Sequence, residues 1–362
     1  MKIITVAGAR PNFIKIAPLY RAFLTRGDRF DHRICHTGQH FDMNMSKIFF
    51  DELEIPEPDF NLGVGSGTHA DQTARIMIEF EKILLQEKPD LILVPGDVNS
   101  TLACSVVASK MGIAVGHVEA GLRSFDREMP EEINRIVTDV LSDYLFVSEG
   151  SGLVNLKNEG IGNEKIHFVG NIMIDSLVHF LPAIEKSSIL KELGLSPQQY
   201  TLMTFHRPRN VDEKEPLAEL VGMLNRLAEK TRLVFPIHPR TRKNLEKYGL
   251  QSKLDTSILL LEPIGYIDFL SLTRSAELVI TDSGGIQEET TFLGVQCITV
   301  RDNTERPVTV SVGTNQLIGT RLTAVEEAAV KVLEGKTKKG KIPDLWDGHT
   351  AERIVTIIEG SL

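Results

Sequence analysis

The stretch Ile3-Ile4-Thr5-Val6-Ala7-Gly8-Ala9-Arg10-Pro11-Asn12-Phe13-Ile14-Lys15 leads from an apolar, β-branched run through a small turn into a plausible helix. Units of this kind recur along the chain, and they are typical of parallel sheets that helices cover on both faces. In the first half, the predicted strands are residues 3–7, 32–36, 91–94, 114–118, 144–147 and 166–169. In the second half, they are residues 200–205, 233–237, 258–261, 278–281 and 296–300. The sequence therefore predicts an α/β protein.

The chain divides into two sets of such units, because a polar stretch at residues 187–199 interrupts the pattern before it restarts. With 362 residues, the chain is long enough for two packed domains. We therefore predict two doubly wound, Rossmann-like domains that face each other across a polar cleft, with residues 1–170 in the first domain and residues 171–345 in the second. The last segment, 346–362, has helical periodicity at residues 350–358.

The composition argues against several kinds of partner and location. A formal net charge of −9 argues against binding to nucleic acid or to an anionic membrane, because both need a basic face. The apolar start of the chain is broken by Gly8 and Arg10, before a signal peptide or a membrane span would be complete. The three cysteines, Cys35, Cys104 and Cys297, are far apart and lack metal-ligand spacing, so we expect reduced thiols in a cytoplasmic protein.

Ionisable side chains follow several predicted strands, where open α/β sheets bind their ligands. The candidates for acid–base chemistry are Asp97, Glu119, Glu131 and His206. Clustered carboxylates shift one another's pKa values apart, which produces an acid and a base. Structural alternatives remain open, since Asp97 can cap a turn and Glu119 can pair with Arg123. Glu131 can stabilise a helix start, and His206, like His238, can be a capping or core residue.

A second set of candidates surrounds Ser283-Gly284-Gly285, a turn that we expect Asp282 to support. Free backbone N–H groups at a helix N-terminus favour anions, so this turn can hold a diphosphate or can merely cap its helix. Glu288 and Glu289, one turn further on, are well placed to accept the two hydroxyl groups of a ribose, which favours nucleotide binding. Cationic contacts can come from Arg10, Lys15 and Arg306, for which solvated surface charge is the other interpretation.

The signatures of common cofactors are missing from the sequence. It has no Gly-x-Gly-x-x-Gly after the first strand, no phosphate-binding loop that ends in Gly-Lys-Ser/Thr, and no Tyr-x-x-x-Lys pair. A mechanism driven by NAD or ATP therefore lacks its usual sequence support, and we expect neither a cofactor nor a metal.

Six stretches resemble, in order, the motif set of the non-hydrolysing UDP-N-acetylglucosamine 2-epimerases. They are Gly8-Ala9-Arg10-Pro11-Asn12-Phe13-Ile14-Lys15, Gly96-Asp97, His117-Val118-Glu119-Ala120-Gly121-Leu122-Arg123, Pro130-Glu131-Glu132-Ile133-Asn134-Arg135, Thr281-Asp282-Ser283-Gly284-Gly285-Ile286-Gln287-Glu288-Glu289 and Thr304-Glu305-Arg306-Pro307. The resemblance covers nearly the whole chain. It implies a glycosyltransferase-B type fold, a C-terminal helix that returns to the first domain, a homodimer, and interconversion of UDP-GlcNAc and UDP-ManNAc for cell-surface polysaccharide precursors.

The resemblance also implies roles for individual residues. It places Glu289 at the ribose and Phe269 beside the uracil. The residues that it places at the diphosphate are Arg10, Ser283, Gly284, Gly285 and Arg306. At the sugar, it puts Asp97, Glu119, Glu131 and His206, with Lys15 nearby. Activation by bound substrate, as in other family members, would involve Gln39, His40 and Arg207. The chain departs from the family pattern at Asn12, at Ile264 and in the short loop at residues 124–129, which bears on the sugar substituents rather than on the nucleotide.

The expected reaction avoids simple deprotonation of C2, because no carbonyl group stands next to that carbon. One carboxylate removes the C2 proton while UDP leaves C1, and UDP adds back to the glycal after protonation from the opposite face. The main alternative is a 2-epimerase for a UDP-2,3-diacetamido uronic acid. Less favoured are a hydrolysing epimerase, a retaining glycosyltransferase and a non-catalytic nucleotide-sugar sensor. Exchange of the C2 proton without an acceptor separates an epimerase from the last two.

Overall fold

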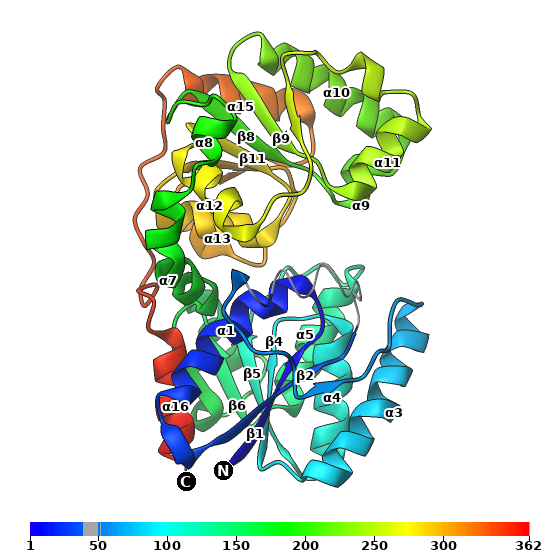
Figure 1. Cartoon of the computed structure of the whole chain (residues 1–362), viewed down its shortest axis with the longest axis vertical. Coiled ribbons are helices and arrows are strands. Elements are labelled where there is room, and N and C mark those ends of the chain that lie inside the picture. The colour runs from blue at the N-terminus through cyan, green and yellow to red at the C-terminus, as the bar shows by residue number, and fades with distance from the viewer. Residues whose placement is uncertain (39–49, 51, 362) are drawn as a thin grey trace. The chain divides into compact units, whose positions relative to one another are not determined.

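The structure, a computed structural model, describes residues 1–38, 50 and 52–361, and of Arg10 it describes only the backbone. The chain divides into two compact units (Figure 1). The first unit comprises Met1–His179 and Asp344–Leu362, and the second comprises Phe180–Pro343. Each unit has one parallel β-sheet with helices on both faces, so the predicted α/β class with two doubly wound domains is confirmed.

The first unit contains a seven-stranded parallel sheet with the order β3-β2-β1-β4-β5-β6-β7. Its strands are β1 (Lys2–Ala7), β2 (Asp31–His36), β3 (Phe60–Asn61), β4 (Leu91–Pro95), β5 (Ala114–Ala120), β6 (Tyr144–Val147) and β7 (Ile166–Phe168). The chain builds the sheet outward from β1 in one direction and from β4 in the other. The carboxyl ends of these two neighbours therefore form the topological switch point, where open α/β sheets bind ligands.

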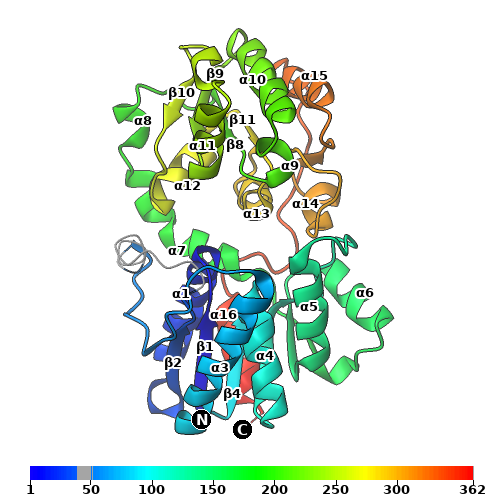
Figure 2. The same ribbon diagram turned by 90° about the vertical axis from the view of Figure 1, so that its right-hand side faces the viewer.

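Helices cover both faces of this sheet (Figure 2). They are α1 (Arg10–Leu24), α3 (His69–Glu87), α4 (Asn99–Lys110), α5 (Pro130–Leu141), α6 (Gly150–Asn158), α16 (Thr350–Glu359) and the first part of α7 (Ile172–Lys186). Ile3 and Leu91 belong to the apolar layer that contains side chains of α1 and α16. Ile4 and Ile92, next in each strand, belong to the layer that contains side chains of α3 and α4. Because this alternation buries both faces of β1 and β4, the sequences of these two strands are largely apolar.

The C-terminal helix α16 packs beside α1, although the two lie at opposite ends of the sequence (Figure 1). Ile354 lies in the apolar layer that the two helices share. Asp175 of α7 accepts hydrogen bonds from the backbone N–H groups of Thr350 and Ala351, at 3.1 and 2.7 Å, and so satisfies the N-terminus of α16. A helix is therefore present where periodicity predicted one, at residues 350–358, and it belongs to the first unit.

The second unit contains a six-stranded parallel sheet with the order β10-β9-β8-β11-β12-β13. Its strands are β8 (Tyr200–Thr204), β9 (Arg232–Pro236), β10 (Leu259–Leu261), β11 (Leu278–Thr281), β12 (Gln296–Thr299) and β13 (Asn315–Leu317). Its helices are α8 (Ile189–Glu192), α9 (Pro208–Val211), α10 (Lys214–Ala228), α11 (Pro239–Lys247), α12 (Tyr266–Ser275), α13 (Gly284–Leu293), α14 (Pro307–Ser311) and α15 (Leu322–Leu333). The neighbours β8 and β11 form the switch point of this sheet.

All eleven strands predicted from the sequence are present, and their ends differ from the predicted ones by at most two residues. The sequence missed β3 and β13, which each lie at the edge of a sheet. Phe60–Asn61 is only two residues long and Asn315–Leu317 is largely polar, so neither has the apolar run of a central strand. Within the described ranges, no helix combines the length and apolar character that crossing a membrane requires.

Candidate active site

Gly96 and Asp97 follow β4 at the switch point of the first sheet. Gly96 has a φ of 72°, in the left-handed region that favours glycine. A Cβ atom at this position would lie 2.9 Å from Nζ of Lys15, which extends from α1. Because Gly96 has no side chain, the Lys15 ammonium can reach this edge of the sheet.

Lys15 forms a buried ion pair with Glu119 of β5, and the two side chains are 8% and 3% exposed. Glu119 has a φ of 75°, which is uncommon for a residue with a side chain, and the pairing of β5 with β6 shifts register at this point. Such a conformation costs on the order of 1–2 kcal/mol and is found most often at functional sites. The alternative ion pair between Glu119 and Arg123 is wrong, since Arg123 pairs with other carboxylates.

Arg135 of α5 contacts two further candidate residues. Its Nη2 atom lies 2.8 Å from Oδ2 of Asp97, and its Nε atom donates to the backbone carbonyl of Glu131 at 3.2 Å. The Arg135 side chain is 2% exposed, whereas that of Asp97 is 31% exposed. The carboxylate of Asp97 is thus fixed by a buried cation but still accessible, as a group that exchanges protons with a substrate must be. Glu131 is half-buried in the first turn of α5.

Asn12 joins the loops on the two sides of this switch point. Its Oδ1 atom accepts hydrogen bonds from the backbone N–H groups of Gly8 and Ala9, at 3.1 and 2.9 Å. Its Nδ2 atom donates to the carbonyl of Pro95 at 2.9 Å. A glutamate carboxylate could not make the last bond, because it has no hydrogen to donate. Asn12, which departs from the family pattern, therefore has a structural role in this chain.

In the second unit, His206 follows β8 and Asp282 follows β11, at the other switch point. Nδ1 of His206 lies 2.8 Å from Oδ1 of Asp282, and the imidazole is 40% exposed. Asp282 also accepts hydrogen bonds from the backbone N–H of Arg207 and the side chain of Asn210, so its carboxylate holds the loop after β8, whereas the sequence predicted that it would support the Ser283-Gly284-Gly285 turn. Burial acts to raise the pKa of Asp282, but these partners outweigh burial and lower the pKa. The ionised carboxylate orients His206 so that Nε2 can exchange a proton.

The remaining candidates of the second unit have different surroundings. His238 is the N-cap of α11, and its Nδ1 atom accepts the backbone N–H of Arg240 at 3.1 Å, so the capping interpretation is confirmed. Arg207 donates from Nε to the backbone carbonyl of Asp282 at 3.0 Å. Phe269 is half-buried on α12, where it packs against an apolar cluster. Three other predicted groups lie outside the described residues: the side chain of Arg10, Gln39 and His40.

Helix α13 begins directly after Ser283, its N-cap, with Gly284 and Gly285 as its first two residues. A Cβ atom at Gly284 would lie 3.0 Å from Oε1 of Glu305 and 3.1 Å from Nη1 of Arg306, which forms an ion pair with that oxygen. The guanidinium of Arg306 therefore lies beside the first backbone N–H groups of the helix. Together, these donors and the helix dipole form an arrangement suited to an anion such as a diphosphate.

Two buried carboxylates hold Arg306 in this place. Nε of Arg306 lies 2.7 Å from Oε1 of Glu288, and its Nη1 atom lies 2.8 Å from Oε1 of Glu305. The other oxygen of Glu305 lies 2.8 Å from Nη2 of Arg301, so this carboxylate bridges two guanidinium groups. Because Glu288 is engaged with Arg306, Glu289 is the better candidate for ribose hydroxyl groups.

No role was predicted for Arg135 or Glu305, although both contact candidate site residues. A signal existed for Arg135, since it lies one helical turn after Glu131 and residues at this spacing share a helix face. Glu305 adjoins Arg306 in the sequence, but its bridge to Arg301 depends on the loop conformation, which the sequence does not reveal.

Glu289 is buried beside Glu288, and the burial and the neighbouring charge raise its pKa from 4.5 to about 8. Between about pH 4.5 and pH 8, Glu289 is protonated in the folded protein but ionised in the unfolded chain. The free energy of unfolding therefore falls as the pH rises through this range. We expect Glu289→Gln to stabilise the ligand-free protein by an amount that grows across this range and reaches roughly 1–4 kcal/mol above pH 8. Melting curves of both proteins between pH 5 and pH 9 measure this difference.

The matched control for this prediction is Glu246→Gln, which removes an exposed carboxylate of the same unit. Solvent screens charges at such positions, so this variant should melt like the unmodified protein throughout the range. A constant difference between Glu289→Gln and the unmodified protein, independent of pH, would contradict a buried group that titrates.

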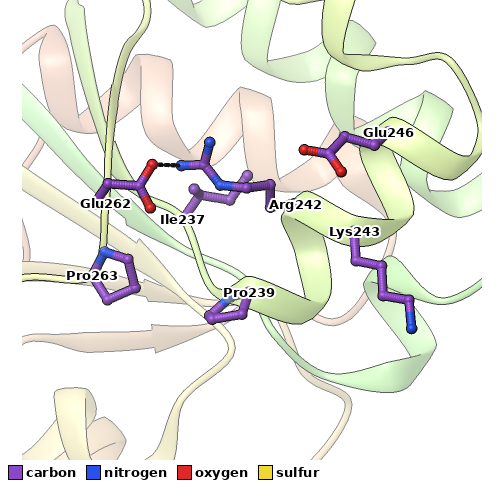
Figure 3. A pocket seen from close by; sticks show the side chains of 7 residues that line it. All are labelled: Ile237, Pro239, Arg242, Lys243, Glu246, Glu262 and Pro263. Atoms are coloured by element: carbon purple, nitrogen blue, oxygen red, sulfur yellow. Dashed lines mark ion pairs between the residues drawn. The ribbon is translucent and has the colours of Figure 1, made fainter. Parts of the chain in front are cut away.

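Two surface hollows lie outside the centres described above. One, of about 230 Å³, lies in the second unit near α11 and the end of β10. Among its lining residues, which Figure 3 shows, Arg242 and Glu262 form an ion pair, at 2.7 Å between Nη2 and Oε1. Its lining contains no predicted site residue. The other, of about 640 Å³, lies in the first unit among α3, α4 and the start of α5. It adjoins the site, because its lining residue Asn134 donates to the carbonyl of Asp97 at 2.9 Å.

Known proteins resemble this chain over nearly its whole length. The family model described as UDP-N-acetylglucosamine 2-epimerase matches residues 23–359. A UDP-N-acetylglucosamine 2-epimerase from Methanococcus maripaludis is 44% identical over 99% of this chain and 98% of its own. A UDP-2,3-diacetamido-2,3-dideoxy-D-glucuronate 2-epimerase from Pseudomonas aeruginosa is 43% identical over 98% of each chain. The crystal structure of Methanocaldococcus jannaschii UDP-GlcNAc 2-epimerase in complex with UDP-GlcNAc and UDP has a TM-score of 0.91 and 46% identity, covering 99% of this chain and 100% of that one.

Proposed function

This chain belongs to the UDP-N-acetylglucosamine 2-epimerase family, and we propose that it interconverts UDP-GlcNAc and UDP-ManNAc. The observation that carries the proposal is a pair of carboxylates at the carboxyl edge of the first sheet, each of which forms an ion pair with a buried cation. Asp97 pairs with Arg135, and Glu119 pairs with Lys15. The Methanocaldococcus jannaschii relative binds UDP-GlcNAc and UDP in its crystal structure, which supports a nucleotide sugar as substrate.

The proposed reaction is an elimination followed by a re-addition. A base removes the proton from C2, the C–H electron pair becomes the C1=C2 double bond, and the C1–O bond breaks with its electrons on the β-phosphate of UDP. This step yields a 2-acetamido glycal, UDP and a protonated base. An acid then protonates C2 on the opposite face while the phosphate oxygen bonds again to C1. Atoms and charges balance, and only the configuration at C2 changes.

We assign the proton transfers to four groups: Asp97, Glu119, Glu131 and His206. Protonation on both faces of C2 needs at least two of them. The accessible carboxylate of Asp97 suits the removal of a proton, while the Lys15 ammonium beside Glu119 suits a site where negative charge develops. Asp282 orients His206 in the second unit, which suits a donor or acceptor of a proton.

We assign the nucleotide to a second group of residues. The diphosphate is assigned to Arg10, Ser283, Gly284, Gly285 and Arg306, the ribose to Glu289 and the uracil to Phe269. The helix N-terminus beside the Arg306 guanidinium supports the diphosphate assignment. UDP must stay bound between the two steps, because its escape would release the glycal, and charge-assisted hydrogen bonds suit this purpose.

A second substrate remains a candidate because of the Pseudomonas aeruginosa relative, which is named for a UDP-2,3-diacetamido-2,3-dideoxy-D-glucuronate. Its identity to this chain is nearly as high as that of the Methanococcus maripaludis relative. The same elimination chemistry would serve both substrates, since they differ at C3 and C6 and not at the reacting carbons.

The proposal extends to assembly, location and regulation. We propose a homodimer, for which Ile78 and Leu85 of α3 offer exposed apolar side chains two helical turns apart. The buried, unpaired thiols of the three cysteines suit a reducing cytoplasm.

Gln39, His40 and Arg207 are the residues through which bound substrate would activate the enzyme. A sigmoidal dependence of rate on UDP-GlcNAc concentration would support this regulation, and a hyperbolic one would remove it.

Proton NMR of UDP-GlcNAc incubated with the protein in deuterium oxide tests the proposed function. Loss of the C2 proton signal together with the appearance of UDP-ManNAc is the expected result. If that spectrum stays unchanged but the UDP-2,3-diacetamido uronic acid loses its C2 proton, the alternative substrate is correct. If neither sugar exchanges, the protein is not an epimerase of this class.

A further inference from the structure

The turn that carries Asp97 is held by hydrogen bonds to three consecutive backbone carbonyls. Asn12 donates to the carbonyl of Pro95 at 2.9 Å, and Asn134 donates to that of Asp97 at 2.9 Å. Between them, Nε2 of His117 lies 2.8 Å from the carbonyl oxygen of Gly96. These side chains come from α1, α5 and β5. The position of the turn therefore depends on buried side chains from three different elements.

The hydrogen bond from His117 to the Gly96 carbonyl restrains a glycine, whose backbone can change conformation more easily than that of other residues. With a φ of 72° and no side chain, Gly96 has few steric restraints, so the peptide group between Gly96 and Asp97 could rotate at little cost. Rotation of that peptide group would redirect the Asp97 side chain. The bond from His117 to the Gly96 carbonyl opposes this rotation.

His117 is itself oriented by a buried carboxylate. A carbonyl oxygen can only accept a hydrogen bond, so Nε2 of His117 must carry a proton. Nδ1 lies 2.6 Å from Oδ1 of Asp139, which implies that a proton lies between these two atoms as well. Oδ2 of Asp139 in turn accepts from Nη2 of Arg123 at 2.7 Å and from the backbone N–H of Gly121 at 3.1 Å. The ring is thus fixed from both of its nitrogen atoms.

The cluster cannot act on a substrate directly. His117 and Asp139 are both fully buried, and Arg123 is 3% exposed and extends the network to Glu159 through two hydrogen bonds of 2.8 and 2.6 Å. The Arg123 guanidinium lies between the carboxylates of Asp139 and Glu159, so each buried charge of this network has an opposite charge beside it. Any influence on the reaction must therefore pass through the backbone of the Gly96–Asp97 turn.

We infer that His117 is a positioning residue for the epimerisation, which fixes the Gly96 carbonyl and thereby the direction of the Asp97 carboxylate, with Asp139 and Arg123 orienting its ring. This inference rests on the proposed function for its kinetic part. Misplacement of a reacting group by about 1 Å can cost about 100-fold in rate, and loss of a supporting hydrogen bond behind a functional group typically costs about 10–100-fold. Nucleotide affinity should change little, because the residues assigned to UDP are largely on the other unit.

The experiment compares His117→Gln, His117→Leu and Asp139→Asn with the unmodified protein. We expect His117→Gln to lower kcat by about 10–100-fold while the Kd of UDP stays within about threefold. His117→Leu should lose more of kcat than His117→Gln, because glutamine still offers an N–H group to the Gly96 carbonyl. The double variant His117→Gln/Asp139→Asn should be no slower than the worse single variant, since both changes act through the same bond.

The matched control is His32→Gln. His32 is also a histidine of this sheet, and its Nε2 atom lies 2.8 Å from Oγ1 of Thr5, on strands β2 and β1. Its replacement disturbs this interstrand contact without touching the turn, so stability should fall while kcat stays within about twofold. If His32→Gln slowed the reaction as much as His117→Gln, the loss would reflect general destabilisation and the inference would fail.

Amide hydrogen exchange gives a second measurement that does not depend on the reaction. In His117→Gln, or in Asp139→Asn if the first variant does not fold, the peptide that covers residues 95–99 should exchange at least about tenfold faster than in His32→Gln. Unchanged exchange would overturn the inference whatever the substrate proves to be. Faster exchange with a normal kcat would also overturn it, since the bond would then serve the fold alone. If the unmodified protein exchanges C2 of neither sugar, the proposed function fails separately.

Discussion

Replacing Asp97 with asparagine is expected to slow the exchange of the C2 proton of UDP-GlcNAc with solvent by about 10²–10⁴-fold, the usual contribution of a positioned acid or base. Asparagine keeps the shape of the side chain but cannot take up a proton at neutral pH. The amide oxygen can still accept the hydrogen bond from Arg135, so the turn and α5 should keep their positions. Proton NMR in deuterium oxide at saturating UDP-GlcNAc measures the exchange rate.

The control for this variant lies at the opposite end of the same strand. Asp90 directly precedes β4, and its Oδ2 atom accepts the backbone N–H of Lys2 at 2.7 Å. Asp90→Asn makes the same chemical change at the amino edge of the sheet, so exchange at C2 should stay within about twofold of the normal rate. If Asp97→Asn exchanged C2 at the normal rate while binding UDP normally, Asp97 would have no part in the chemistry, and Glu119, Glu131 or His206 would have to supply the base.

The positions of the candidate residues at the ends of strands could be predicted because parallel sheets impose a simple pattern on the sequence. A strand covered on both faces needs a nearly continuous apolar run, and Leu91-Ile92-Leu93-Val94 and Leu278-Val279-Ile280 are such runs. Each is followed by a small or polar turn, and the topology then brings those turns to one edge of the sheet. Asp97 and His206 could therefore be selected without any knowledge of their contacts.

The contacts themselves could not be predicted, because they join segments that are far apart in the sequence. Lys15 and Glu119 are separated by 104 positions, and no local signal marks the left-handed conformation that directs Glu119. Local charge spacing favoured Arg123 as the partner of Glu119. In the structure, Arg123 forms ion pairs with Asp139 of α5 and with Glu159 at the end of α6. Sequence spacing can propose ion pairs within one helix, but pairs between elements depend on sheet register.

The second large effect is expected at the nucleotide, where Arg306→Gln should weaken UDP binding by about 100-fold. Hydrogen bonds to charged groups contribute about 1.5–3 kcal/mol each, and about 1.4 kcal/mol corresponds to a factor of ten in Kd. Arg306 lies beside Gly284, at the N-terminus of α13, with two donor atoms already ordered by Glu288 and Glu305. Isothermal titration with UDP measures the loss, and titration with uridine, which has no phosphate, should show little change.

Removal of Arg306 also changes the charge balance inside the protein, and the experiment must separate this effect from the loss of a ligand contact. Glu288 is 1% exposed, and loss of the guanidinium beside it removes the cation that compensates this buried carboxylate, which costs stability. The double variant Arg306→Gln/Glu288→Gln removes one charge of each sign, so its melting temperature should recover while its affinity for UDP stays low. Arg274→Gln is the control, since Arg274 forms an exposed ion pair with Glu185 in the same unit. A double variant that folds and binds UDP normally would mean that Arg306 only neutralises the carboxylates around it. The backbone N–H groups of α13 would then hold the diphosphate without this guanidinium.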